Sequence, residues 1–293
     1  MSDELLSLLS PARLTHVVDV GANPIDGVPP YQQMLSQGLC TVTGFEPQEQ
    51  ALAALNDRKG PLETYLPHAL GSGGQATLNI CQYSGWTSLL EPSAAALAVF
   101  PQFQANAKVV AQIPVFTHKL DDIHEVRPFD LLKIDVQGAE MAVFQGAIHH
   151  LKNAVAIQTE ISFIALYENQ PTFGQVDVFL RDLGFVPHGF ADIKRWPIAP
   201  LEFHGTAQQS VHQLLEADVV YVKNFVHPSG MSDEQLKQLS LIMHHVYQSH
   251  DLSARCIQCL IERGVLPGDS LQRYVDQLNA NCANKKGLAE KLC

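Results

Sequence analysis

The sequence predicts an α/β fold built on a doubly wound, mostly parallel sheet. Short apolar runs alternate with segments of helical periodicity from Thr15 to about Asn224, a pattern typical of βαβ units. The 293 residues are 46% hydrophobic and 17% charged, which supplies a large core and argues against disorder. Two of the apolar runs also end in an acid beside a glycine or proline, as expected where strands meet turns.

Five buried runs are expected to be strands of this sheet, and Glu63–His68 is expected to be another. The five are His16–Gly21, Thr41–Glu46, Asp130–Val136, Val155–Ser162 and Asp218–Lys223. Apolar residues at helical spacing predict helices over Ala139–Leu151 and Phe173–Leu183, the second ended by Gly184.

Two further stretches depart from this alternation of strands and helices. Gln75–Gln82 alternates like an edge strand, and Val109–Leu120 reads as extended. Pro114 lacks a backbone N–H and therefore argues against a central strand there. Both are expected to be antiparallel additions over the carboxyl edge of the parallel sheet.

After Asn224 the pattern becomes helical. Ser232 and Gln235 have the spacing of a capping box, and two more helices are predicted over Asp251–Arg263 and Leu271–Leu278. The first of these helices carries an apolar stripe formed by Leu236, Leu239, Met243 and Val246. Such a stripe must be buried against the rest of the chain or a second copy.

Charge and cysteine content restrict the partners and the compartment. With 19 Lys+Arg and 30 Asp+Glu the net charge is −11, which argues against nucleic-acid and anionic-membrane binding. Met1–Ser10 has no basic region typical of a signal peptide, and no apolar run approaches the roughly 18 residues of a membrane span. Six scattered cysteines form no disulfide framework. A soluble, cytoplasmic protein is expected.

Asp19-Val-Gly21-Ala-Asn23 follows the first strand directly. Its glycine allows a tight turn close to a ligand, and the helix beyond offers unpaired N–H groups. Glu46, before Pro47, ends the next strand, where an acid in doubly wound sheets binds the ribose hydroxyls of a nucleoside. A plain strand-to-helix turn is the alternative.

The charge of the loop distinguishes between nucleosides. A dinucleotide site needs G-x-G-x-x-G around a pyrophosphate, whereas this loop reaches its second glycine only at Gly27. Asp19 and Asp26 would repel a pyrophosphate but suit a cation. S-adenosylmethionine carries a sulfonium and an ammonium and no phosphate, so this cofactor is favoured over NAD.

Five motifs together resemble the FkbM-type family of S-adenosylmethionine-dependent methyltransferases over roughly residues 15–224. They are VVDVGAN, GFEP, SGWTSL, LLKIDVQGAE and TEISFIALYENQPTF. The resemblance implies a class I methyltransferase (Rossmann-like) fold, with a seven-stranded sheet that has one antiparallel strand. It also implies methyl transfer to oxygen, often in sugar, polyketide or other secondary-metabolite biosynthesis. On this view residues 1–226 are the methyltransferase domain and 227–293 a C-terminal helical extension.

The resemblance also implies the cofactor contacts. They are Asp19, Gly21, Ala22 and Asn23 at the methionine end, Glu46 and Pro47 at the ribose, and Ala69 and Leu70 beside the adenine. The chain departs from the family pattern in the place of the second loop glycine, Gly27, which lies behind Pro24.

Lys133, Asp135 and Glu140 lie in LKIDVQGAE and are candidate catalytic residues. Lys133 and Asp135 share one face because side chains alternate along a strand. Glu140 begins the next helix, where the dipole favours its ionised form. An alcohol needs a positioned base to attack the methyl group, and Glu160 on the next strand would orient the acceptor. The alternative for Asp135 and Glu140 is a buried ion pair with Lys133. No one residue is singled out as the base. No metal ligand is expected.

The expected function is methyl transfer from S-adenosylmethionine to a hydroxyl oxygen of a sugar or secondary metabolite. The alternatives are N-methylation of a side-chain amide in a modified peptide, and a non-catalytic module that binds the cofactor. Trp86 in the donor-methyl position would favour the non-catalytic module. Around Trp86, the loop that contains Ser84, Thr87 and Ser88 is expected to form either a lid over the substrate or a packed turn. The helical extension is expected to pack near the acceptor side, or to form a homodimer.

Overall fold

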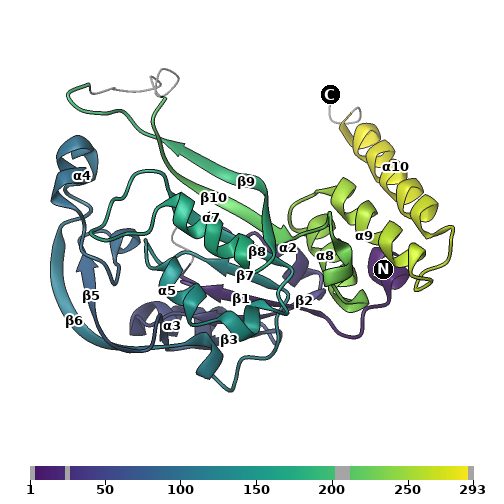
Figure 1. The fold of residues 1–293 in the computed structure, drawn as a ribbon, viewed down its shortest axis with the longest axis horizontal. Helices are drawn as coiled ribbons and strands as arrows, with labels where there is room; N and C mark the ends of the chain where they lie inside the picture. Colours follow the sequence, from purple (N-terminus) through teal and green to yellow (C-terminus); the bar gives the residue numbers. More distant parts are fainter. Residues whose placement is uncertain (1–3, 24–26, 202–211, 290–293) are drawn as a thin grey trace.

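A seven-stranded sheet forms the centre of the protein (Figure 1). The computed structural model describes residues 4–23, 27–201 and 212–289. The strand order is β3-β2-β1-β7-β8-β10-β9, and β10 alone runs antiparallel to both of its neighbours. The strands are β1 (Thr15–Val20), β2 (Cys40–Phe45), β3 (Glu63–Leu66), β7 (Leu131–Ile134), β8 (Ala156–Ser162), β9 (Phe185–Arg195) and β10 (Leu214–Lys223). The predicted fold class is confirmed.

Strand β9 is the one strand of this sheet that the sequence pattern does not predict. Pro187 and Gly189 interrupt its apolar alternation. Pro187, which lacks an N–H, is tolerated because β9 pairs only with β10 and forms the edge of the sheet.

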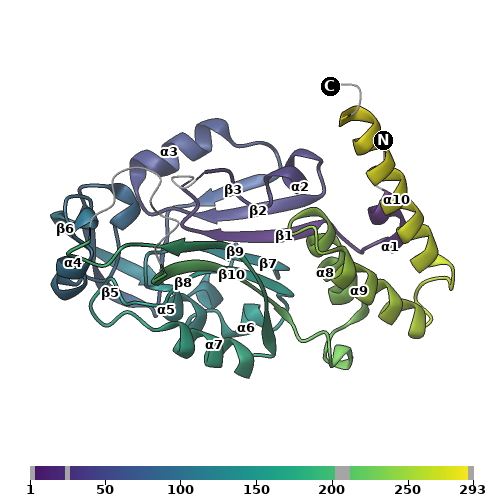
Figure 2. The same cartoon turned by 90° about the horizontal axis from the view of Figure 1, so that it is seen from above.

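One face of the sheet packs against α5 (Glu140–Gln145), α6 (Ile148–Leu151) and α7 (Phe173–Asp182) (Figure 2). Alternate strand residues such as Val18 and Leu132 join helix residues such as Phe144 in one buried cluster. On the other side lie α2 (Gln32–Ser36) and α3 (Glu49–Arg58). Helices therefore cover both faces, as doubly wound sheets require.

The single helix predicted over residues 139–151 is wrong, since α5 and α6 are separate helices. A side chain at Gly146 would place its Cβ 2.6 Å from the carbonyl oxygen of Gly71, so the chain turns where only glycine fits. The Asp121 carboxylate then accepts the N–H groups of His149 (2.9 Å) and His150 (3.0 Å) and caps the new helix.

A second sheet of three strands, β4 (Ala69–Leu70), β6 (Val109–His118) and β5 (Gly74–Cys81), lies beside α4 (Ala94–Val99) (Figure 1). The antiparallel pairing of β5 with β6 is as predicted. The expectation that Pro114 excludes a central position is wrong, because β6 lies between the other two strands. However, β4 pairs only with Thr117 and His118. Among the described residues, β6 is therefore paired at Pro114 with β5 alone, so the proline lies at a local edge.

The C-terminal helices are α8 (Asp233–His245), α9 (His250–Glu262) and α10 (Ser270–Ala289). The predicted capping box is present: Ser232 Oγ accepts the N–H of Gln235 at 3.2 Å, and Gln235 Oε1 accepts that of Ser232 at 2.9 Å. Cys256 and Cys259 are free and buried in the apolar core. No helix among the described residues combines the length and the apolar character needed to cross a bilayer.

These helices pack on the amino-terminal ends of the strands, together with α1 (Glu4–Leu9) (Figure 2). Thr15 Oγ1, at the start of β1, donates to Gln238 Oε1 of α8 at 2.7 Å, and Leu239 shares one buried cluster with Val17 and Leu131. The expected position near the acceptor side is therefore wrong. The apolar stripe of α8 is covered within the chain, so it does not by itself call for a second copy.

Because this core is shared, we expect the C-terminal helices and the sheet to unfold together. The two tryptophans, Trp86 and Trp196, pack in a different cluster, beside α4. Urea unfolding followed by tryptophan fluorescence should therefore coincide with unfolding followed by far-UV circular dichroism. Leu239→Ala should lower the free energy of unfolding obtained from both probes by about 2–5 kcal/mol. Val275→Ala, at an exposed position, should change neither value much. An early dichroism transition that leaves fluorescence unchanged would contradict this expectation.

Candidate active site

The site lies where β1 and β7 are neighbours and the strand order reverses. β2 and β3 continue to one side of this point and β8, β10 and β9 to the other, which leaves a crevice at the carboxyl ends. Gly21 follows β1 with φ +78°, and a Cβ there would lie 2.1 Å from the carbonyl oxygen of Asp135. Glycine is therefore required because the two loops touch, rather than only for approach to a ligand.

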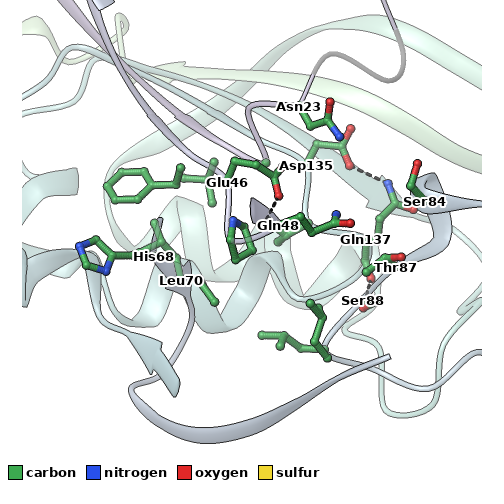
Figure 3. A pocket seen from close by; sticks show the side chains of 18 of the residues that line it. Asn23, Glu46, Gln48, His68, Leu70, Ser84, Thr87, Ser88, Asp135 and Gln137 are labelled. Atoms are coloured by element: carbon green, nitrogen blue, oxygen red, sulfur yellow. Dashed lines mark hydrogen bonds between the residues drawn. The ribbon is translucent and has the colours of Figure 1, made fainter. Parts of the chain in front are cut away.

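A pocket of about 790 Å³, including its open mouth, occupies this crevice (Figure 3). The predicted site residues that line it are Gly21, Asn23, Glu46, Pro47, Ala69, Leu70 and Asp135. The predicted residues that do not line it are Asp19, Ala22, Lys133, Glu140 and Glu160. Asp26 and Pro24 lie outside the described residues.

The lining combines apolar side chains with carboxylates. Leu70, Leu78 and Leu89 are among its apolar residues, while Glu46 and Asp135 supply acids. Among the described residues that line the pocket there is neither lysine nor arginine. This surface suits an uncharged ring and a cationic group, and it offers no cation to a pyrophosphate.

Glu46 is held rigidly at the end of β2. Its side chain is buried, and Oε1 accepts the N–H of Gln48 at 2.7 Å (Figure 3). Burial raises the pKa of Glu46, whereas hydrogen bonds from the backbone of Gln48 and Asn23 lower it. The carboxylate is thus fixed beside the loop that contains Asn23, as a ribose contact requires.

Asp19 supports the site from behind the lining. It is 1% exposed, and Tyr31 donates its hydroxyl to Oδ2 at 2.5 Å. Oδ1 lies 3.6 Å from Lys133 Nζ and accepts no hydrogen bond from the described residues. Lys133 in turn donates to the carbonyl oxygen of Gly21 at 3.4 Å. The lysine therefore pairs with Asp19, and not with Asp135 and Glu140 as the ion-pair alternative expected.

These neighbours determine the charge of both groups. Burial raises the pKa of Asp19, which Lys133 and Tyr31 oppose. Burial alone would lower the pKa of Lys133, but Asp19, Asp135 and Asp218 raise it to about 12. The lysine is consequently an ammonium under all ordinary conditions, and it is not a base.

Glu140 turns its carboxylate toward the backbone of its own loop. Oε1 accepts the N–H groups of Val136 at 3.0 Å and of Gly138 at 3.1 Å, and the side chain is 6% exposed. Burial raises the pKa of Glu140 to about 7. Its place in the structure is that of a support for the turn after Asp135.

Glu160 is also buried, and it pairs with a residue that the sequence pattern does not indicate. Lys194 Nζ lies 2.8 Å from Glu160 Oε1 and 3.8 Å from Glu216 Oε2. Burial, Glu216 and Asp135 raise the pKa of Glu160, and Lys194 opposes them. Lys194 was missed because its strand, β9, was missed.

Gln137 is a second residue without a predicted role, although it lies within LKIDVQGAE. It lines the pocket, and its Nε2 donates to Asp135 Oδ1 at 2.7 Å (Figure 3). The backbone carbonyl oxygen of Gln137 accepts a hydrogen bond from the Ser88 hydroxyl at 2.7 Å. The only sequence signal was its position between two predicted site residues.

The loop around Trp86 contributes small polar side chains to the pocket. Ser84, Thr87 and Ser88 line it, but Trp86 does not. The indole is buried against Phe103 and Tyr167, with ring centroids 5.2 and 5.6 Å away. It therefore leaves the pocket open.

Comparison with known proteins places the chain in a family. The family model described as Methyltransferase FkbM domain matches residues 19–187. No curated protein matches the chain.

Solved structures with a related arrangement have very different sequences. Methyltransferase FkbM from Methylobacillus flagellatus KT is 11% identical with a TM-score of 0.39, covering 71% of this chain and 43% of its own. Magnesium protoporphyrin IX methyltransferase from Synechocystis PCC 6803, with bound SAM, is 10% identical with a TM-score of 0.36, covering 75% and 76%. Precorrin-6y C5,15-methyltransferase from Geobacter metallireducens GS-15 is 13% identical with a TM-score of 0.35, covering 75% and 85%. The chain thus spans less than half of the Methylobacillus protein, and likenesses of this size carry no argument about substrate.

The raised pKa of Glu140 predicts a pH dependence of stability. Between its ordinary value of 4.5 and about 7, the unfolded chain has lost a proton that the folded chain keeps. Wild-type stability therefore falls as pH rises through this range, and Glu140→Gln should be spared this loss. The free energy of unfolding of the variant relative to wild type should rise by at most roughly 1.4 kcal/mol per pH unit. Urea unfolding at pH 5 and pH 8 measures it, with exposed Glu49→Gln as the control; a pH-independent difference for Glu140→Gln would contradict the assignment.

Proposed function

Because the chain belongs to the FkbM methyltransferase domain family, a family of S-adenosylmethionine-dependent methyltransferases, we propose that it methylates a hydroxyl oxygen of a small polar acceptor. The acceptor class is a sugar or a secondary metabolite. One observation supports this most: Asp135 is the candidate catalytic residue that lines the pocket, whereas the carboxylates of Glu140 and Glu160 are engaged elsewhere.

The residues present fit S-adenosylmethionine. Glu46 would hold the ribose hydroxyls, and Ala69 and Leu70 would flank the adenine. The lining supplies carboxylates and, in its described part, no cation, which suits a ligand that carries a sulfonium and an ammonium.

When bound, the cofactor supplies a methyl group that is already activated by its sulfonium. What remains for the chain is to align the acceptor with that methyl group and to accept the hydroxyl proton. In the proposal Asp135 takes this proton while the oxygen–carbon bond forms and the sulfur–carbon bond breaks. S-adenosylhomocysteine and the methyl ether are the products, and Asp135 then returns the proton to solvent.

The open pocket also bears on the non-catalytic alternative. Trp86, or another bulky side chain, in the donor-methyl position would support that alternative. Trp86 instead packs into an apolar cluster outside the pocket. Trp86 thus gives no support to a non-catalytic role.

Glu46→Gln should weaken binding of S-adenosylhomocysteine by about ten- to a hundredfold, because a hydrogen-bonded charged partner typically contributes roughly 1.5–3 kcal/mol. Isothermal titration calorimetry measures this change. Glu49→Gln, three residues along and exposed, is the matched control and should bind like wild type. Equal affinities for the two variants would remove Glu46 from the cofactor site.

Asp135→Asn should reduce kcat by about 10²–10⁴-fold, the usual contribution of a general base, while the affinity for S-adenosylhomocysteine changes less than about threefold. The assay is transfer of radiolabelled methyl groups to a panel that holds sugars, polyols and peptides with amide side chains. Methylation of peptide amides alone would contradict the proposed acceptor. Full turnover by Asp135→Asn on a hydroxyl acceptor would contradict the role of Asp135.

A further inference from the structure

Gln137 occupies an unusual backbone position in the turn between β7 and α5. Its φ is +54°, in the left-handed region that residues other than glycine seldom adopt, and Gly138 follows at +95°. Glu140 holds the turn through the N–H groups on either side of Gln137. A strained conformation that its surroundings fix so firmly points to a function for the side chain it presents.

The amide of Gln137 has a defined orientation. Its Nε2 lies 2.7 Å from Asp135 Oδ1 and 3.4 Å from Glu160 Oε2, and ionised carboxylates only accept hydrogen bonds. Its Oε1 lies 3.3 Å from the Tyr167 hydroxyl, whose single proton is shared with the carbonyl oxygen of Trp86, also at 3.3 Å. A flipped amide would turn its oxygen toward the nearby carboxylate oxygen of Asp135, so only one orientation is favourable.

We infer that Gln137 is a positioning residue, which holds the Asp135 carboxylate aimed at the acceptor hydroxyl. Glu160 and Tyr167 fix the amide, and the amide fixes Asp135. This inference rests on the proposed function, in which Asp135 accepts the hydroxyl proton.

Several titratable groups surround Asp135. The charged or titratable groups that face it from the packed elements are Asp19 of β1, Lys133 of β7, Glu140 of α5, Glu160 of β8, Lys194 of β9 and Asp218 of β10. Carboxyl groups outnumber lysines in this set, and each lysine already pairs with another acid. Among the described residues, the amide of Gln137 is therefore the side-chain group that donates a hydrogen bond to the Asp135 carboxylate and fixes its direction.

The test follows the Asp135 carboxyl directly. Protein labelled with ¹³C at aspartate side-chain carboxyls, and saturated with S-adenosylhomocysteine, is titrated by NMR; Asp135→Asn identifies the signal. In Gln137→Leu the titration midpoint of this signal should move about one to two pH units higher, the effect of losing a charge-assisted hydrogen bond. The nearly isosteric Gln137→Glu should move it further, because a carboxylate replaces the donor. The exposed Gln145→Leu, in α5, should leave it unchanged, and an unchanged midpoint in both Gln137 variants would overturn the inference.

Kinetics separate this inference from the proposed function. With a hydroxyl acceptor that wild type methylates, Gln137→Leu should lower kcat at pH 7 about tenfold and move the acid limb of the pH–rate profile upward. Its affinity for S-adenosylhomocysteine should stay within about threefold of wild type. Unchanged kcat and pH profile would overturn the inference while leaving the proposed function intact. Absence of any hydroxyl methylation by wild type would overturn the proposed function, and the NMR titration would still decide how Gln137 acts on Asp135.

Discussion

The contact between Gly21 and the backbone of Asp135 is the constraint on which the site depends. A Cβ at position 21 would lie 2.1 Å from the Asp135 carbonyl oxygen, so any side chain would force the two loops apart. Because β1 and β7 are neighbours, this contact lies at the point where the strand order reverses. The Asp19–Lys133 pair lies directly behind it, and Lys133 also binds the Gly21 carbonyl oxygen.

The buried charges around this contact divide into supports and pocket groups. Asp19, Glu140 and Glu160 each have partners within the chain: a lysine and a tyrosine, two backbone N–H groups, and Lys194, respectively. Glu46 and Asp135 are the carboxylates that line the pocket. Buried carboxylates with fixed partners thus lie behind the two that line the pocket, as is usual where a site is held rigidly.

The sequence predicted well those features that follow from local periodicity. Buried strands and their carboxyl ends could be recognised from apolar runs, which is why Gly21, Glu46 and Asp135 were found. The edge strand β9 was missed because Pro187 breaks the alternation, and Lys194 was lost with it. The interruption at Gly146 depends on Gly71, which is distant in sequence. An apolar stripe shows that α8 must be buried but not where, so its place at the amino ends of the strands could come only from the structure.

The central claim is that the contact between Gly21 and Asp135 is needed to form the cofactor site. Calorimetric titration of wild type and Gly21→Ala with S-adenosylhomocysteine, with circular dichroism to establish that both are folded, tests this directly. The account predicts that wild type binds, and that the folded variant binds at least about a hundredfold more weakly, a loss of roughly 2.7 kcal/mol. Equal affinity of the two proteins, or a folded wild type that does not bind, would contradict it.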